Sequence, residues 1–184
     1  MKKAVNPWKK LSSQTIYKNQ WISLREDQVI RPDGEKGIYG VLETRIATGV
    51  VAIDTENYIY LVGQYRYPTD CYSWEIPEGG GDPGEAPLTT IQRELKEETS
   101  LVASDWVQLG PEVHLSNCIS SERAYLFLAR GLTVIPTKNP DTTEILEVKR
   151  VTFQTALQMA RSGEIVDAIS IIALERAANF LGLR

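Results

Sequence analysis

A glycine-rich loop followed directly by an amphipathic helix is the feature of this sequence that most restricts its fold. Residues 79–84 contain four glycines, which is typical of a backbone that must bend tightly. The apolar residues after the loop recur at helical spacing and predict a helix over residues 86–99. Leu88, Ile91 and Leu95 form the stripe that we expect this helix to bury. The bend is expected to bring main-chain carbonyls close to the helix.

The acidic charge of the chain is concentrated in the same segment. The 184 residues carry 20 Lys and Arg against 24 Asp and Glu, which is a formal net charge of −4. Residues 75–98 hold seven acids and two bases, a balance of −5, so the rest of the chain sums to +1. A surplus confined to one loop and one helix needs a local explanation.

Three glutamates near the end of this helix, Glu94, Glu97 and Glu98, are placed unfavourably unless they bind a cation. Glu94 and Glu98 are four residues apart, so they lie on one helix face, where like charges repel. The negative end of the helix dipole also disfavours acids there. Oxygen ligands select hard ions, so the cluster predicts Mg²⁺ or Mn²⁺ and, with it, phosphate chemistry. A solvated acidic face is the alternative interpretation.

The rest of the sequence predicts strands before this helix and further helices at the end. An antiparallel arm is expected within residues 14–45, from strands at 15–17, 22–30 and 37–44. Further strands are predicted at 49–54 and 58–66, paired as a hairpin, and at 74–77, 106–110, 123–132 and 144–153. Helices are predicted at 155–162 and 167–181. This order predicts an α/β fold in which a mixed sheet packs between helices.

Composition excludes several classes of protein. Apolar residues make up 42% and charged residues 24%, which is typical of a globular domain rather than a disordered or membrane-spanning chain. A mildly acidic chain has no overall attraction for nucleic acid or an anionic membrane, so neither is expected as a partner. Cys71 and Cys118 are expected to be free, mostly buried thiols, which predicts a cytoplasmic location; a single disulfide is the alternative.

The spacing of the loop and helix resembles the Nudix box. After Gly79, five residues precede Glu85, and seven more precede the run Arg93-Glu94-Leu95-Lys96-Glu97-Glu98-Thr99-Ser100-Leu101. The Nudix pattern is Gly, five residues, Glu, seven residues, then Arg-Glu-aliphatic-any-Glu-Glu-any-Gly-aliphatic, and eight of its nine specified positions match. The exception is Ser100, where the pattern has glycine; a left-handed backbone there would cost serine about 1 kcal/mol.

This resemblance implies a Nudix-type α/β/α sandwich and the metal-dependent hydrolysis of a nucleoside diphosphate linked to another group. It also implies roles for individual residues. Glu94 and Glu98 are the principal ligands of Mg²⁺ (or Mn²⁺), and the main-chain oxygen of Glu78 is another. Glu97 is a further ligand or a proton acceptor. Arg93 is expected to orient the glutamates, and Glu85 is expected to be structural.

The general base and the substrate-binding residues follow less directly. In similar enzymes the base often comes from a late loop, so Glu144 is the first candidate, with Glu122 and Glu97 behind it. The alternatives are a solvent-facing position for Glu144 and a role in positioning substrate for Glu122. Arg66 is predicted to bind substrate because its fork suits phosphate oxygens, with Glu75 beside it. The alternative is a salt bridge between Arg66 and Glu75.

Sequence outside the box resembles the group of ADP-ribose and nucleoside-diphosphate-sugar pyrophosphatases. The similar segments are Tyr65-Arg66-Tyr67, Trp74-Glu75-Ile76-Pro77-Glu78-Gly79, Ser121-Glu122-Arg123 and Glu144-Ile145-Leu146-Glu147-Val148. The group implies a homodimer that exchanges its N-terminal strands. The expected domains are therefore a dimer-forming β arm at 1–45 and a Nudix hydrolase domain at 46–184. The alternatives are another Nudix substrate, such as a dinucleoside polyphosphate or NADH, and a non-catalytic nucleotide sensor.

Overall fold

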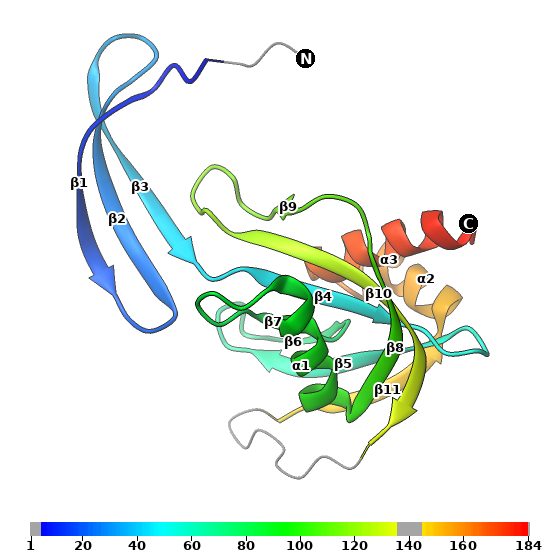
Figure 1. Cartoon of the computed structure of the whole chain (residues 1–184). Coiled ribbons are helices and arrows are strands. Elements are labelled where there is room, and N and C mark those ends of the chain that lie inside the picture. Colours follow the sequence, from blue (N-terminus) through cyan, green and yellow to red (C-terminus); the bar gives the residue numbers. More distant parts are fainter. Residues whose placement is uncertain (1–4, 136–144, 184) are drawn as a thin grey trace. The chain divides into compact units, whose positions relative to one another are not determined.

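The computed structural model describes residues 5–135 and 145–183, and its backbone forms two compact units (Figure 1). The N-terminal unit comprises Met1–Arg45 and His114–Glu122. The main unit comprises Ile46–Val113 and Arg123–Arg184. Within the described ranges, no helix is long and apolar enough to cross a membrane. Cys71 and Cys118 are both free, as predicted, but the prediction that they are mostly buried is wrong, because Cys71 is half-buried and Cys118 is exposed.

The N-terminal unit is a three-stranded antiparallel sheet in the order β1-β2-β3. Its strands are β1 (Lys9–Lys18), β2 (Ile22–Ile30) and β3 (Lys36–Thr44). Its second segment borders β3, because the N–H of Leu42 donates to the carbonyl of Ile119 over 2.9 Å. This confirms the predicted antiparallel arm, although β1 is longer than predicted.

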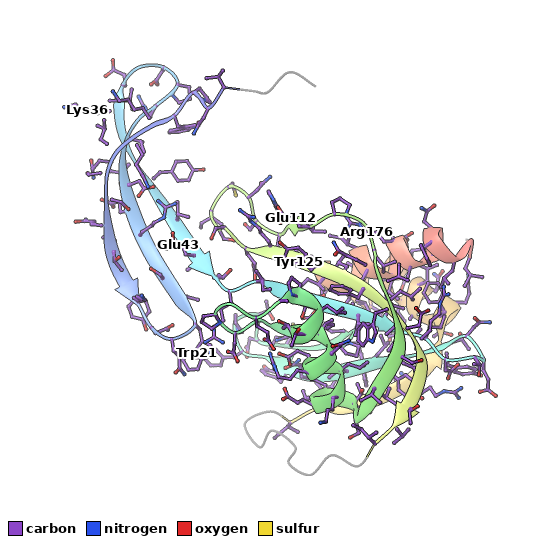
Figure 2. The ribbon with its side chains drawn as sticks, viewed as in Figure 1. Trp21, Lys36, Glu43, Glu112, Tyr125 and Arg176 are labelled. Atoms are coloured by element: carbon purple, nitrogen blue, oxygen red, sulfur yellow. The ribbon has the colours of Figure 1, made fainter. Side chains whose placement is uncertain are left out.

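The N-terminal unit has almost no core among its described residues. Only Asp27 and Val29 of this unit are buried. Trp21, by contrast, is 61% exposed and lies at one end of the sheet (Figure 2). A sheet of three strands normally needs an apolar face that packs against something. The arm therefore lacks the internal packing that would stabilise it alone.

The main unit contains two sheets. The first has the order β7 (Glu78–Gly80), β4 (Ala47–Ala52), β10 (Arg123–Val134) and β8 (Leu101–Gln108), with β9 (Val113–His114) beside β10. The second has the order β11 (Glu147–Thr152), β5 (Tyr58–Arg66) and β6 (Cys71–Glu75). Because β4 runs parallel to β10 and antiparallel to β7, the first sheet is mixed, as predicted.

The described helices are α1 (Pro87–Thr99), α2 (Phe153–Ser162) and α3 (Ala168–Leu181). Helices α1 and α3 cover opposite faces of the first sheet, while α2 packs against α3 and the second sheet. Ile91 and Leu95 of α1 share a buried cluster with Val50 of β4. On the opposite face of β4, a methyl group added to Gly49 would come within 2.6 Å of Ile169 of α3. Neighbouring strand residues point to opposite faces, so β4 lies between α1 and α3, which confirms the α/β/α arrangement.

The predicted hairpin of residues 49–54 and 58–66 is wrong beyond its turn. β4 and β5 are joined by one bridge between Ile53 and Ile59, and then enter different sheets. Val50 and Val51, neighbours on β4, are both fully buried, so β4 is covered on both faces. A strand covered on both faces pairs on both edges inside the fold, and β4 finds its partners in β7 and β10.

The buried face of α1 also differs from the predicted stripe. Ile91 and Leu95 are fully buried, but Leu88 is 39% exposed and Thr90 is buried instead. The Thr90 hydroxyl donates to a carboxylate oxygen of Glu85 over 3.0 Å, which satisfies its polar atom in the interior. The buried side of α1 is therefore turned toward the glycine-rich loop, and the helix face that carries Glu94 turns with it.

The last predicted strand is also shorter than expected. Residues 147–152 form β11, and Phe153 already begins α2, because the Thr152 side chain caps that helix by accepting the N–H of Thr155. Glu144, the first candidate for the general base, lies outside the described residues.

Candidate active site

The glycine-rich loop and the carboxylate helix meet at Gly79 and Glu94. A Cβ placed on Gly79 would lie 2.1 Å from the carboxyl carbon of Glu94, so only glycine allows the Glu94 carboxylate this close to the loop backbone. The loop is held by β7, which pairs with β4, and by the Thr48 hydroxyl, which donates to the Gly79 carbonyl over 3.0 Å. The first glycine of the box is therefore required at this position for a steric reason.

Arg93 joins three of the box carboxylates. Its Nη1 donates to Glu94 over 2.8 Å and to Glu97 over 3.0 Å. Its Nη2 donates to Glu85 over 3.2 Å and to the main-chain carbonyl of Gly80 over 3.2 Å. A planar guanidinium with several donors suits this task, because it fixes several oxygens in one geometry. Arg93 therefore orients the glutamates, as the resemblance implies.

Glu85 belongs to the support of the site. Its carboxylate accepts hydrogen bonds from Arg93, from the backbone N–H of Asp82 and from the Thr90 hydroxyl. The hydrogen bond from Arg93, followed by the backbone hydrogen bond from Asp82, lowers the pKa of Glu85 to about 2. With its charge engaged inside the loop, Glu85 fits the structural role implied for it.

Glu98 connects the end of α1 to the residue before the box glycine. Its Oε2 accepts the backbone N–H of Glu78 over 3.1 Å. The peptide backbone at Glu78 is therefore next to the Glu98 carboxylate. This brings together the main chain of Glu78 and one of the two helix carboxylates that were expected to share a metal ion with it.

A second group of charged residues lies on β5, β6 and β7. Arg66 donates through Nε to Glu75 over 2.9 Å and through Nη2 to Glu78 over 2.8 Å, and Nη2 also bonds Glu75. The Glu75 side chain is only 3% exposed, whereas that of Arg66 is 36% exposed. The salt bridge between Arg66 and Glu75 that the sequence left as an alternative is thus present. Hydrogen bonds to Glu75, followed by the charges of Glu75 and Glu78, raise the pKa of Arg66 despite its partial burial.

Asp167 completes this second group. It immediately precedes α3 and caps it, because its Oδ2 accepts the N–H of Ser170 over 2.6 Å. One carboxylate oxygen from each of Glu75, Glu78 and Asp167 lies within 4.8 Å of the other two. Burial, then the negative charges of Asp167 and Glu75, raise the pKa of Glu78 well above its usual value.

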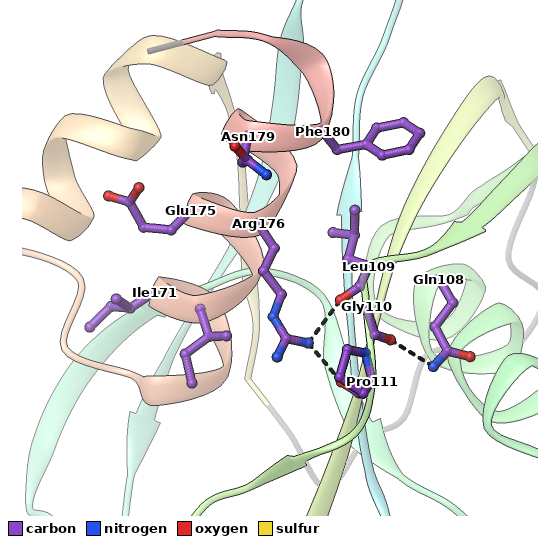
Figure 3. Close-up of a pocket in the computed structure, with 10 residues that line it drawn as sticks. Gln108, Leu109, Gly110, Pro111, Ile171, Glu175, Arg176, Asn179 and Phe180 are labelled. Carbon is purple, nitrogen blue, oxygen red and sulfur yellow. Dashed lines mark hydrogen bonds between the residues drawn. The ribbon is translucent and has the colours of Figure 1, made fainter. Parts of the chain in front are cut away.

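Helix α3 is held by hydrogen bonds at its first turn and at its middle, which fixes Asp167. Near its start, the buried Ser170 hydroxyl accepts the backbone N–H of Ile76 over 2.9 Å. Further along, Arg176 donates to the carbonyls of Leu109 and Pro111 over 2.8 and 2.7 Å (Figure 3). Arg176 lines an apolar hollow of about 530 Å³ that also includes Ile171 and Phe180 of α3, and contains no residue of either carboxylate group.

The structure places most of the predicted site residues in two adjoining groups. Glu94 and Glu97 meet at Arg93, while Arg66, Glu75 and Glu78 form the second group, and Glu98 touches the Glu78 backbone. Glu122 belongs to the N-terminal unit, where its N–H donates to the Ser120 hydroxyl over 3.1 Å.

Asp167 is a site residue that the sequence did not indicate. An Asp at the start of a predicted helix signals an N-cap, and that role uses only one of its two oxygens. Its proximity to Glu75 and Glu78 depends on how the start of α3 meets the segment that follows β6, which local sequence does not encode.

The residues of the first group fit a divalent metal ion. The donor set consists of carboxylate oxygens and main-chain carbonyls, the ligands that hard ions such as Mg²⁺ prefer. The closeness of Glu94 to the Gly79 backbone, which a Cβ would abolish, brings a carboxylate to the backbone of the loop. The Glu98 carboxylate lies at the backbone of Glu78, whose N–H it accepts.

Family comparisons agree with this geometry. The NUDIX domain model matches residues 43–169, which is more than half of the chain. The chain belongs to the Nudix family. Members of this family generally use divalent metal ions. A second model, the nucleoside diphosphate sugar hydrolase N-terminal domain, matches residues 8–42.

Individual relatives align with nearly the whole length of this chain. It is 31% identical to an ADP-ribose pyrophosphatase of Bacillus subtilis, over 91% of this chain and 90% of the relative. It is 33% identical to an ADP-ribose pyrophosphatase of Mycobacterium tuberculosis, over 91% of this chain and 82% of the relative. A crystal structure of an ADP compounds hydrolase shares the fold with a TM-score of 0.82 and 21% identity, covering 98% of this chain and 97% of that one.

Proposed function

We propose that this protein hydrolyses the pyrophosphate bond of ADP-ribose or a related nucleoside diphosphate sugar. The products are a nucleoside monophosphate and a sugar phosphate. The observation that carries the proposal is the set of box glutamates oriented by Arg93 against the Gly79 loop. Two ADP-ribose pyrophosphatases that align with nearly the whole chain support the substrate class.

Mg²⁺ or Mn²⁺ is the proposed cofactor. Glu94, Glu98 and the main-chain oxygen of Glu78 would hold it. When bound, such an ion neutralises charge on the pyrophosphate oxygens and lowers the pKa of a coordinated water. Arg93 keeps Glu94 and Glu97 in place, and Gly79 leaves room for the Glu94 carboxylate.

A carboxylate must accept the proton of the attacking water. Glu144 is the first proposed candidate for this base, with Glu122 and Glu97 behind it. Of these, Glu97 lies in the described part of the main unit, and its side chain is 46% exposed at the end of α1. Each candidate is substituted singly by Gln, and the pH dependence of kcat is compared between the variants. Only the substitution of the true base should remove the acidic limb of that pH profile.

Arg66 and Glu75 are proposed to bind substrate together. The Arg66 side chain is 36% exposed even though Glu75 and Glu78 bind its guanidinium, which leaves Arg66 open to a phosphate oxygen. Arg is suited to this because its donors form a fixed fork. In this arrangement Glu75 sets the direction of the guanidinium.

A substrate panel tests the proposed activity. ADP-ribose, GDP-mannose, ADP-glucose, NADH and diadenosine polyphosphates are each incubated with Mg²⁺ or Mn²⁺, and monophosphate release is measured. Release from ADP-ribose or a nucleotide sugar supports the proposal. Preference for NADH or a dinucleoside polyphosphate shifts the substrate class. Binding without release from any compound indicates a nucleotide sensor.

Glu98→Gln tests the site itself. Gln retains an oxygen that can accept the Glu78 N–H but removes the charge, so the fold should survive while turnover falls by at least about 100-fold. Glu175→Gln, on the outer face of α3 and paired with Arg161, is the control and should retain activity. Full activity in Glu98→Gln would contradict the proposed metal site.

We also propose that residues 1–45 form a dimerisation arm and residues 46–184 the hydrolase domain. The two family models, which meet between residues 42 and 43, support this boundary. The arm exposes many large apolar side chains: Val5, Trp8, Leu11, Ile16, Tyr17, Trp21 and Ile38. Exposed apolar clusters of this kind mark surfaces that another protein covers. A second copy of the chain is the proposed occupant, and free thiols at Cys71 and Cys118 fit the proposed cytoplasmic location.

Light scattering tests the dimer. The wild-type protein should have about twice the 20.6 kDa mass of one chain. Ile16→Asp places a charge within the exposed apolar arm and should shift the mass toward one chain. Val166→Asp, an equally exposed apolar position in the main unit, should leave the mass unchanged. A wild-type monomer would contradict the proposal.

A further inference from the structure

Glu78 carries a polar atom that the fold leaves without a partner. Its side chain is 10% exposed, and its Oε2 is buried and accepts no hydrogen bond from the described residues. The other oxygen, Oε1, accepts Nη2 of Arg66. A buried acceptor without a donor costs free energy, so such an atom calls for an explanation.

The groups around Glu78 do not supply the missing donor. Glu75 and Asp167 each place a carboxylate oxygen within 4.8 Å of one from Glu78. Ionised carboxylates only accept hydrogen bonds. Glu75 already binds Arg66 through both of its oxygens, and Asp167 uses Oδ2 to cap α3. The Glu78 carboxylate therefore lies among acceptors, and a positive centre is the group that would satisfy all of them.

The spacing and charge of this cluster match a divalent cation. Oxygens around one ion at about 2.1 Å for Mg²⁺, or about 2.3–2.6 Å for Ca²⁺, lie at most about 4–5 Å apart. The three carboxylates are within that range. When all are ionised, the single positive charge of Arg66 leaves two negative charges uncompensated. All-oxygen donors select a hard ion.

The cluster is built into the fold rather than formed by mobile surface side chains. The Glu75 side chain is 3% exposed on β6. The N–H of Ile76 donates to the buried Ser170 hydroxyl, which ties the chain after Glu75 to the first turn of α3 and so holds Asp167 in place. Rigid placement of the ligands favours binding, because little conformational freedom is lost when the ion enters.

We propose that Glu75, Glu78 and Asp167 form a second divalent-cation site, separate from the carboxylates of α1. Its cation is Mg²⁺, Mn²⁺ or Ca²⁺, and it links the segment between β6 and β7 to the start of α3. Because the N–H of Glu78 binds Glu98, the site adjoins the box. The proposal rests on these three side chains and not on turnover of any substrate.

Mn²⁺ binding to the full chain tests the site. In Glu94→Gln/Glu98→Gln the box ligands are neutralised, and titration of free Mn²⁺ by electron paramagnetic resonance should still show about one bound ion per chain. Adding Asp167→Asn should weaken that remaining binding by about tenfold or more. Asn caps a helix as well as Asp does, so α3 should stay intact.

Glu78→Gln, added to the same double variant, is a second test and should also weaken the residual binding. Glu175→Gln, which removes a carboxylate from the exposed face of α3, is the matched control and should not. Absence of Mn²⁺ binding in the box double variant at millimolar Mn²⁺ would overturn the proposal. So would residual binding that neither Asp167→Asn nor Glu78→Gln reduces. These readouts need no substrate, so an inactive enzyme would not affect them.

Discussion

Ser100 departs from the family pattern at a position where the backbone is left-handed. Its φ is 58° and its ψ is 25°, and its N–H closes α1 by donating to the Lys96 carbonyl over 3.0 Å. A side chain in this conformation costs about 1–2 kcal/mol, which glycine avoids. The left-handed backbone therefore explains why the family pattern has glycine at this position. Serine still forms the helix cap, but it lowers the stability of the protein.

Ser100→Gly should therefore stabilise the protein. Removing the strain gains about 1–2 kcal/mol, and the greater freedom of glycine in the unfolded chain returns about 0.5–1 kcal/mol. A net gain of up to about 1 kcal/mol corresponds to about 2–4 °C in Tm for a chain of this size, measured by calorimetry.

Gly163→Ala is the reverse change at a comparable helix end. Gly163 closes α2 with φ 82°, and a Cβ there would meet no atom within 4 Å, so any loss of Tm reports conformation alone. A drop in Tm for Gly163→Ala together with a rise for Ser100→Gly is expected. A lower Tm for Ser100→Gly would contradict this account of the cap.

At the scale of elements, the site depends on how closely β7 and α1 approach each other. β4 holds β7 by its backbone, and Ile91 and Leu95 hold α1 on the sheet. Between them, the space at Gly79 is filled by the Glu94 carboxylate. The contact lies at the flexible end of a side chain, so a substitution there can disturb the site without breaking the packing.

Gly79→Ala should separate function from stability. The added methyl displaces the Glu94 carboxylate, so Mn²⁺ affinity and turnover should fall by about tenfold or more, while the free energy of unfolding changes by less than about 1 kcal/mol. Gly49→Ala is the matched control. Its methyl would meet core atoms of Ile169 and Ile76, so it should destabilise by about 1–3 kcal/mol. Equal effects of both variants on Mn²⁺ affinity and stability would refute this distinction.

The start of α1 predicts a pH dependence. The hydrogen bond from Arg93 lowers the pKa of Glu85 to about 2, below the value of about 4.5 expected when unfolded. The folded state then binds fewer protons, so the stability that Glu85 contributes is complete above about pH 4.5 and is lost as the pH falls toward 2. Glu85→Gln should therefore lose stability relative to wild type at pH 7 but much less at pH 2.5, measured by urea unfolding. The same loss at both pH values would contradict the ion pair.

At the scale of the whole molecule, the formal net charge of −4 comes from one short segment of the chain. The balance of −5 within residues 75–98 is spread over two adjoining carboxylate groups, one oriented by Arg93 and one by Arg66. Each group has more carboxylates than guanidinium groups. Bound cations would reduce the repulsion within both groups, so they should favour the folded protein.

Millimolar Mg²⁺ or Mn²⁺ should raise the Tm of the wild-type chain, and a chelator should reverse the rise. An ion that binds only the folded state adds about 2.7 kcal/mol of stability at a concentration of 100 times its Kd. The shift should shrink in Glu94→Gln/Glu98→Gln and be lost when Asp167→Asn is added. A Tm that does not change with either ion would contradict the explanation that the clustered carboxylates bind cations.

Much of the first carboxylate group could be predicted because its residues are close in sequence. Glu94 and Glu98 share a helix face through a spacing of four residues, and Arg93 reaches Glu97 across one turn. The N-terminal arm was predictable from turn residues between apolar strands. The hairpin of β4 and β5 was not, because nearby apolar strands carry no local signal that tells a hairpin from two strands in different sheets.

Sequence by itself determined the box, the helix that carries it and the concentration of acidic charge, since these depend on residue type and short-range spacing. Only the tertiary structure decided that Asp167 lies beside Glu75 and Glu78, about ninety residues earlier in the chain. The start of α3 is joined to the segment after β6 by the hydrogen bond from the Ile76 N–H to the Ser170 hydroxyl. Burial at that junction is what leaves the Glu78 oxygen without a partner.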